Sequence, residues 1–358
     1  MSAPSSPKLP VAILGCGRMG QRHAHNFHHL TPRAAIVAIG HPSALAAQWV
    51  QDHLPGVLCY ADPEQVSSLP NVDAVVISTI TSTHTPFTMK AIEHGLHVLL
   101  EKPISVDVED TRPVVDAASS KPEVKVMIGF VRRFDQALNG LAGELVGSKL
   151  GKSYLLKSTS MDPYDPVLES LYLMPRPLAA SLWTAGGIHD IDMSRWLLSL
   201  PSGTPVKPTR VIASGLITAH PELADQGYCD NALAIIEYDN GSFCTLHLSR
   251  TGMAGYESRV EAYRKGGKQV ITMEKEAAGA PFKSVEAGTA DMPSYMDRYG
   301  VALIHEAKAF IDCVLDDTPS PTSAYDGLQA ALIAKALTHS FQTGKAVEFD
   351  RAGEPVLL

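Results

Sequence analysis

The feature that most constrains the fold is a glycine-rich motif near the start of the chain, Gly15–Gly20, with the sequence GCGRMG. It follows directly after the apolar run Val11–Leu14 and opens a helical segment. In this pattern the first glycine permits a tight turn, the second lets the backbone approach a pyrophosphate, and the third allows a helix to pack closely on a strand. The N–H groups that begin such a helix are oriented toward a phosphate. The alternative is a chance cluster of glycines, but the strand, loop and helix context favours a dinucleotide site.

Short apolar runs alternate with helical stretches over residues 10–130. The runs are Val11–Leu14, Ala35–Ile39, Ala74–Ser78, His97–Leu100 and Val124–Ile128. Because they lack polar alternation, they predict strands of a parallel sheet that is buried on both faces. We therefore expect an α/β fold with a doubly wound Rossmann domain over residues 10–130. The proline-rich start, MSAPSSPKLP, predicts a flexible tail over residues 1–9.

The pattern changes after residue 130. Several strands follow one another, and Asp239–Gly241 has the composition of a hairpin turn because Asn and Gly accept positive φ. Lys265–Gly267 predicts a second hairpin. Four helices are expected, near Phe134–Val146, Ile188–Leu198, Ser294–Leu315 and Ser323–Thr343. Residues 131–358 are thus expected to form an α+β domain around a mostly antiparallel sheet. Such a sheet, with helices mainly on one side, leaves an apolar face that a homodimer or homotetramer would cover.

Composition excludes several classes of function. The chain has 30 basic and 38 acidic residues among 358, with a net charge of -8, so it lacks the basic surplus that nucleic acid binding needs. No apolar run approaches the roughly 18 residues of a membrane helix, and no secretory signal opens the chain. The five cysteines are scattered and predict reduced thiols in a cytoplasmic protein. His25 and His29 have a spacing that can bind metal, but no other ligand accompanies them, so no metal site is expected.

The choice of cofactor depends on the end of the second apolar run. An NAD-selective fold carries Asp or Glu there, which bonds the ribose 2′-OH. This chain has Gly40, His41, Pro42 and Ser43 instead. The missing acid favours NADP over NAD, with His41 and Ser43 as donors to the 2′-phosphate and Arg33 nearby in sequence. The alternative is that His41 and Ser43 only shape the loop, and that NAD is used.

A second candidate site is the turn Glu101–Pro103, which ends the run His97–Leu100. Ligands of doubly wound sheets lie at the carboxyl ends of strands, so Lys102 is expected to face the ligand. Pro103 biases Lys102 toward extended geometry. Glu101 is expected to hold the Lys102 ammonium group or to face the nicotinamide ribose. The simpler alternative for Lys102 is a solvated surface lysine.

An ordered set of motifs along nearly the whole chain resembles the Gfo/Idh/MocA family of NAD(P)-dependent oxidoreductases, especially its inositol dehydrogenase branch. The motifs are Gly15–Gly20, Thr83-His84, His94–Val98, Glu101–Pro103, Gly129–Asp135, His189–Asp192, Arg195–Leu197, Asp297–Tyr299 and Thr343–Lys345. The resemblance implies a Rossmann domain followed by an α/β domain with a large open sheet, through which members form oligomers. It also implies hydride transfer between a nicotinamide cofactor and a polyol, cyclitol, sugar or related carbonyl compound, without a metal.

The resemblance assigns roles to individual residues. It implies that Lys102 and His189 are the catalytic acid–base residues. The residues that it implies for substrate binding are Asp192, Arg132, Asp162 and Tyr256. The residues expected at the cofactor, from the motif and the resemblance together, are Gly15, Cys16, Gly17, Arg18, Met19, Gly20, His41, Ser43, Thr79, His84, Glu101 and Lys102.

The chain departs from the family pattern at one position. Four residues before the histidine the family usually has Asp, whereas this chain has Ala185. Without that carboxylate, His189 loses a charged neighbour. The main expectation is an NAD(P)-dependent dehydrogenase or reductase that acts on CH–OH groups. Two alternatives remain open: a reductase of a secondary metabolite with a modified acid–base set, and a non-catalytic dinucleotide-binding sensor.

Overall fold

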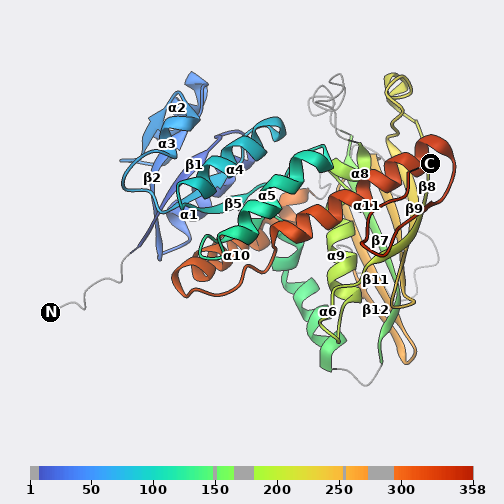
Figure 1. Ribbon diagram of the computed structural model, residues 1–358. Coiled ribbons are helices and arrows are strands. Elements are labelled where there is room, and N and C mark those ends of the chain that lie inside the picture. Colours follow the sequence, from blue (N-terminus) through green and yellow to red (C-terminus); the bar gives the residue numbers. More distant parts are fainter. Residues whose placement is uncertain (1–7, 148–150, 165–180, 253–254, 273–293, 358) are drawn as a thin grey trace. The chain divides into compact units, whose positions relative to one another are not determined.

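The computed structural model describes residues 8–147, 151–164, 181–252, 255–272 and 294–357 (Figure 1). The chain forms two compact units. The first consists of residues 1–134 with 301–328, and the second of residues 135–300 with 329–358. The sequence places residues 301–328 in the second domain, but in the structure they pack with the first unit.

The first unit contains a six-stranded parallel sheet in the order β3-β2-β1-β4-β5-β6. This order is that of a doubly wound dinucleotide-binding sheet. The strands are β1 (Leu9–Leu14), β2 (Ala34–Gly40), β3 (Leu58–Tyr60), β4 (Ala74–Ile77), β5 (His97–Leu100) and β6 (Val126–Ile128). The continuous apolar runs become buried central strands, as predicted. Leu9 belongs to β1 and is 3% exposed, although the sequence predicts it in a flexible tail. Residues 1–7 of that tail lie outside the described residues.

Helices connect these strands. They are α1 (Arg18–His29), α2 (Ala44–His53), α3 (Pro63–Val66), α4 (His84–Glu93) and α5 (Val108–Ser120), with short 3₁₀ turns at Thr81–Thr83 and Val131–Phe134. Because the strand order runs in opposite directions from β1 and from β4, right-handed crossovers place α1 on one face and α4 and α5 on the other. Residues 301–315 of α10 (Tyr295–Leu315) also belong to this unit, and the ring of Phe310 packs edge-on against Phe27 of α1 at 6.4 Å between centroids.

The second unit contains a seven-stranded sheet in the order β12-β11-β7-β10-β9-β8-β13. Its strands are β7 (Ser153–Pro163), β8 (Pro208–Leu216), β9 (Asn231–Tyr238), β10 (Phe243–Gly252), β11 (Glu257–Arg264), β12 (Gly267–Ile271) and β13 (Val347–Glu348). Both predicted hairpins are present, joining β9 to β10 and β11 to β12. The sheet is mostly antiparallel, as expected, but β7 lies between β11 and β10 and runs parallel to β10.

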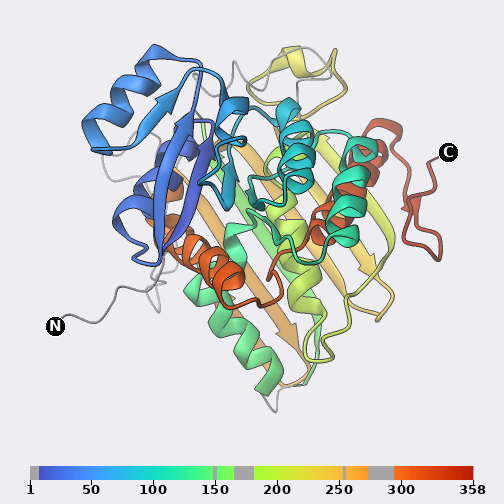
Figure 2. The same ribbon diagram turned by 60° about the vertical axis from the view of Figure 1, so that its left-hand side comes forward.

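Helices cover one face of this second sheet (Figures 1 and 2). They are α6 (Gln136–Gly147), α8 (Leu182–Ala185), α9 (Ile188–Leu198) and residues 329–343 of α11 (Ala324–Thr343), and a 3₁₀ turn forms at Pro221–Leu223. β9 and β11 alternate between buried residues, which face the helices, and more exposed residues on the other face, and β10 does so from Phe243 to Leu248. None of the described helices has the length and hydropathy of a membrane span.

Candidate active site

The glycine loop has the geometry that the motif predicts. Gly15 has φ +93°, and a Cβ built on it would lie 2.6 Å from the carbonyl oxygen of Ser78. A Cβ on Gly20 would lie 2.0 Å from the carbonyl oxygen of Gly15. Both distances are far below van der Waals contact, so the turn after β1 and the approach of α1 to it require glycine at these positions.

The middle glycine is different, because a Cβ on Gly17 would meet no atom within 4 Å. Gly17 is the N-cap of α1, no side chain caps the helix there, and its first turn has no acidic residue. The space beside Gly17 is therefore open, and the first N–H groups of α1 lie at the positive end of the helix dipole, where a pyrophosphate fits. Arg18 is exposed beside Gly17, and Met19 is half-buried.

Cys16 contributes backbone rather than thiol chemistry to this loop. It is 2% exposed, and burial raises the pKa of its thiol to about 11, so the sulfur is neutral and unreactive at neutral pH. Its carbonyl oxygen accepts a hydrogen bond from the Gln21 amide at 3.4 Å.

Ser78, whose bond to the glycine loop the sequence did not predict, fixes the loop from the end of β4. Its hydroxyl donates to the carbonyl oxygen of Gly15 at 2.9 Å. Next to it, Thr79 accepts a hydrogen bond from the Thr83 hydroxyl at 2.7 Å. The hydroxyl-rich sequence after β4 was the available signal, but the contact with Gly15 depends on the parallel pairing of β1 with β4.

His84 connects two of the predicted site segments. Its Nδ1 lies 2.8 Å from the carbonyl oxygen of Pro103, and its Nε2 lies 3.1 Å from that of Thr79. Burial is the largest influence on this imidazole and lowers its pKa, so the ring is neutral at neutral pH and donates to one carbonyl at a time. His84 is 2% exposed. It thus holds the loop after β4 against the Glu101–Pro103 turn.

The residues at the end of β2 shape their own loop. The Ser43 N–H donates to His41 Nδ1 at 3.1 Å, and the Ser43 hydroxyl caps α2 by accepting from the Leu45 N–H at 3.2 Å. Burial lowers the pKa of His41, so it is uncharged at neutral pH. Arg33 precedes β2, at the opposite end of the strand, and its guanidinium bonds Asp312 and Asp316. Although Arg33 is nearby in sequence, it is therefore not available at the end of β2.

The Glu101–Pro103 turn is anchored by a histidine from α1. His23 Nε2 lies 2.8 Å from Glu101 Oε1, and the Lys102 N–H donates to Glu101 Oε2 at 3.2 Å. Burial raises the pKa of Glu101, but the hydrogen bond with His23 and the nearby Lys102 outweigh burial and lower it, so the carboxylate is ionised. The Lys102–Pro103 bond is cis. Sequence reasoning did not assign His23 to the site.

In the second unit, the predicted histidine and aspartate lie on the first turns of α9. His189 is 7% exposed, and Asp190 and Asp192 are fully buried. Asp190 Oδ1 accepts hydrogen bonds from Ser158 at 2.5 Å and Ser160 at 2.8 Å, both on β7. These bonds fix the start of α9 on the sheet.

The surroundings of Ala185 contain another carboxylate. Ser158, Ser160 and Asp162 occupy alternate positions of β7 and so point to the same face, toward α9. A Cβ on Gly186, the residue after Ala185, would lie 4.0 Å from Asp162 Oδ2. The carboxylate of Asp162 therefore lies beside the turn that joins α8 to α9.

The two remaining predicted residues are buried. Arg132 is 3% exposed in the turn Val131–Phe134. Tyr256 is 5% exposed and packs edge-on against Tyr295 and Tyr299, with centroid distances of 5.6 Å and 6.2 Å.

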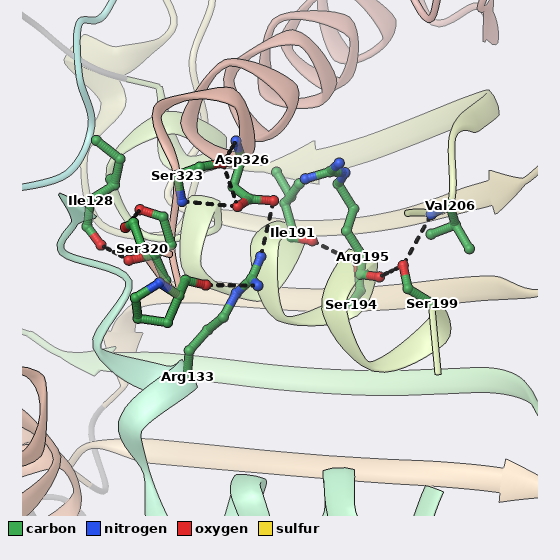
Figure 3. A network of polar contacts seen from close by, with 12 residues as sticks. Ile128, Arg133, Ile191, Ser194, Arg195, Ser199, Val206, Ser320, Ser323 and Asp326 are labelled. Atoms are coloured by element: carbon green, nitrogen blue, oxygen red, sulfur yellow. Dashed lines mark hydrogen bonds and ion pairs between the residues drawn. The ribbon is translucent and has the colours of Figure 1, made fainter. Parts of the chain in front are cut away.

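Arg133, next to Arg132, has a structural role. Its guanidinium lies 3.3 Å from Asp326 and donates to the Pro321 carbonyl oxygen at 3.4 Å, while Asp326 accepts from Ser323 at the start of α11 (Figure 3).

The fold and these residues define an oxidoreductase with a dinucleotide-binding Rossmann domain. Residues 9–130 match the model of the oxidoreductase family with an NAD-binding Rossmann fold, and residues 144–349 match that family's C-terminal alpha/beta domain. The chain belongs to the Gfo/Idh/MocA family of oxidoreductases, and it is an NAD(P)-dependent enzyme of that family.

Similar proteins agree with this assignment. The chain is 26% identical to myo-inositol 2-dehydrogenase of Thermotoga maritima over 96% of its length and 99% of the relative's. It is 29% identical to scyllo-inositol 2-dehydrogenase (NAD(+)) of Bacillus subtilis, over 96% and 97% of the two chains. Its structure is similar to scyllo-inositol dehydrogenase from Lactobacillus casei with bound NAD(H) and scyllo-inositol, with a TM-score of 0.82, 25% identity, and coverage of 95% and 99%.

Proposed function

We propose that this enzyme oxidises a ring hydroxyl of a cyclitol, or reduces the corresponding ketone. The observation that carries the proposal is the open space at Gly17 in a loop that is otherwise closed by glycine contacts, with the Lys102 turn held to the neighbouring loop by His84. Support for the substrate class comes from the relatives, which are named for inositols. When bound, the nicotinamide supplies the hydride chemistry.

We assign the proton transfer to Lys102 and His189. Lys102 extends from the carboxyl end of β5, where doubly wound sheets bind ligands. General acid–base catalysis of this kind contributes on the order of 10²–10⁴-fold. Asp192, Asp162, Arg132 and Tyr256 are proposed to bind the substrate hydroxyls. Asp162 has a further part in this proposal: it supplies the carboxylate near the start of α9 that Ala185 does not.

The proposal includes a preference for NADP over NAD. Support comes from the absence of Asp and Glu at positions 40–43, which removes the group that repels a 2′-phosphate. Since Arg33 is held by aspartates and His41 is uncharged, the donors left for that phosphate are neutral, and the discrimination between the two cofactors is expected to be small.

A homodimer or homotetramer in the cytoplasm completes the proposal. The sheet face opposite the helices exposes Ile212, Leu216, Leu233, Ile235 and Phe243, and apolar side chains on neighbouring strands favour a partner sheet. All five cysteines lie within the described residues and none forms a disulfide, which supports a reducing compartment.

The test is an assay of the purified protein with NAD and NADP against a panel of inositol stereoisomers, their ketones, and open-chain polyols. We expect reduction of the cofactor with at least one inositol, measured by absorbance of the reduced nicotinamide. Cofactor binding without hydride exchange into any of these substrates would favour the non-catalytic alternative. Activity with open-chain polyols alone would move the substrate class away from cyclitols.

A further inference from the structure

Three titratable side chains from distant parts of the sequence interact with one another in the first unit. They are His23 on α1, Glu101 after β5, and Glu306 on α10. His23 is 1% exposed and Glu306 is fully buried. One helical turn after His23 and one after Glu306, Phe27 and Phe310 contact each other, so the two helices present these polar residues on their facing sides.

Glu306 has an unusual environment for a carboxyl group. Among the described residues, neither of its oxygens has a hydrogen-bond partner, and the same holds for His23 Nδ1. A buried polar group without a partner costs about 1–3 kcal/mol, and a buried charge costs more. Such a group needs an explanation beyond packing, because a leucine would fill the space without this cost.

The charge state of the cluster follows from its geometry. Two carboxyl groups that share a buried site cannot both ionise easily. Burial, followed by the charge of Glu101, raises the pKa of Glu306 well above its ordinary value of 4.5. Glu101 is the ionised member, since the hydrogen bond from His23 and the nearby Lys102 stabilise its carboxylate. The pair thus carries one negative charge on Glu101 and one proton on Glu306.

We propose that Glu306 is a positioning residue that keeps the buried pair at a single negative charge and so maintains the Glu101–Lys102 turn for catalysis. The inference rests on the catalytic role proposed for Lys102. An ionised Glu306 would repel Glu101, weaken its contact with His23, and favour the ammonium form of Lys102. The groups that face the pair are His23 from α1, Lys102 from the turn, and His84 from α4.

The decisive variants are Glu306→Gln and Glu306→Leu, with Lys308→Gln on the exposed side of α10 as the matched control. Glutamine has the shape and neutrality of the protonated acid, so kcat of the Glu306→Gln enzyme at neutral pH should stay within about threefold of wild type. Glu306→Leu removes the polar group and should lower kcat by between about 10-fold and 100-fold, because a small misplacement of a reacting group has effects of this size. Cofactor affinity should not change.

A pH profile separates positioning from simple packing. In the wild type, kcat should decline at alkaline pH as Glu306 ionises, and this decline should be absent in Glu306→Gln. Lys308→Gln should follow the wild type. Equal profiles for the wild type and Glu306→Gln, or full activity of Glu306→Leu, would overturn the proposal.

Two measurements need no substrate and so remain informative if the proposed function fails. First, the melting temperatures of wild type and Glu306→Gln should be compared between pH 4.5 and the folded-state pKa of Glu306. The wild type loses stability as the pH rises over this range, because its folded state keeps a proton that the unfolded state releases. The melting temperature of Glu306→Gln relative to wild type should therefore increase with pH. Second, acylation of the Lys102 amine, followed by peptide mass spectrometry, should be slower in wild type than in Glu306→Gln at alkaline pH. A melting-temperature difference that is independent of pH would show that Glu306 is not held protonated. If both measurements behave as expected but no dehydrogenase activity is found, only the proposed function fails.

Discussion

The hydroxyl of Ser78 donates a hydrogen bond to the carbonyl oxygen of Gly15 at 2.9 Å, and this bond joins the end of β4 to the turn after β1. A Cβ on Gly20 would reach the same oxygen at 2.0 Å. The Gly15 carbonyl oxygen thus accepts the hydrogen bond from Ser78 and also lies in close contact with Gly20 of α1. This contact sets the shape of the loop, and Gly17 is left as the position where a ligand can approach the backbone.

The glycine loop therefore gives two separable effects. Gly20→Ala should displace the loop, lower the melting temperature by several degrees, and abolish cofactor binding, because its Cβ meets backbone. Gly17→Ala should leave the melting temperature unchanged, since its Cβ meets no protein atom, yet weaken cofactor affinity by about tenfold or more. Thermal unfolding and calorimetric titration measure the two effects. A Gly17→Ala protein with unchanged affinity for both cofactors would contradict the placement of the pyrophosphate.

Cofactor preference can be tested at His41. His41→Asp should shift the ratio of affinities toward NAD, because a carboxylate at the end of β2 bonds the 2′-OH and repels a 2′-phosphate. Gly40→Asp is unsuitable, since a Cβ there would lie 2.5 Å from the Cα of Pro63. Arg33→Gln is the control and should not alter the ratio, because Arg33 bonds Asp312 and Asp316 instead. If wild-type protein binds NAD as tightly as NADP in calorimetry, the proposed preference is wrong.

Much of the fold could be predicted because its signals are local. Continuous apolar runs identified the buried strands β1, β2, β4, β5 and β6, and turn residues identified the two hairpins. The three-residue strand β3 escaped prediction because Leu58 is exposed and its neighbours are half-buried, so no apolar run marks it. The position of β7 between β10 and β11 also escaped, since pairing between distant strands leaves no trace in a single sequence.

The site was predictable where a motif carries it, as at Gly15–Gly20. Its supporting residues were not, because their partners are far away in the chain. His23 and Glu101 are 78 positions apart, and Ser78 is 63 positions from Gly15. Glu306 did have a local signal: it lies three residues after Leu303 and four before Phe310, inside the apolar stripe of a helix. A charged residue at such a position indicates either a partner or a shifted pKa.

The exposed face of the second sheet gives a prediction about assembly. Leu233→Arg places a charge in the middle of this face, where Leu233 is 59% exposed, and should convert an oligomer to monomers. Leu45→Arg, at an 84% exposed position on α2, is the control and should not change the molecular mass. Light scattering at micromolar concentration measures both. A monomeric wild type would contradict the proposed homodimer or homotetramer. An oligomeric Leu233→Arg protein would place the interface on another surface.

Asp230 gives a pH-dependent prediction on stability. It is fully buried and accepts hydrogen bonds from the N–H groups of Thr218, Ala219 and His220. Burial raises its pKa, but these bonds and one from Asn231 outweigh burial and lower the pKa below 3.8. Asp230→Asn should lower the free energy of unfolding by about 1–3 kcal/mol at neutral pH.

The sign of the pH effect follows from the lowered pKa. Asp230 contributes stability that is present above its unfolded-state pKa and is lost as the pH falls through the folded-state value. The difference between wild type and Asp230→Asn, measured by urea unfolding, should therefore shrink as the pH is lowered below about 4. A difference that is constant across this range would mean that the carboxylate charge contributes nothing.

The catalytic set makes the last prediction. Lys102→Ala should abolish turnover and leave cofactor affinity nearly intact, because the phosphates are assigned to the Gly15–Gly20 loop. His189→Ala should also lower kcat sharply, whereas Asp192→Asn should chiefly raise KM, since its proposed role is to hold a hydroxyl.

If Asp162 supplies the carboxylate for His189, Asp162→Asn should lower kcat, and Ala185→Asp combined with Asp162→Asn should restore part of the lost activity. Steady-state kinetics with calorimetric controls for cofactor binding measure all five proteins. A Lys102→Ala enzyme with near wild-type kcat would mean that this chain uses the family's fold without the proposed proton transfer. A double variant no better than Asp162→Asn alone would restrict Asp162 to substrate binding.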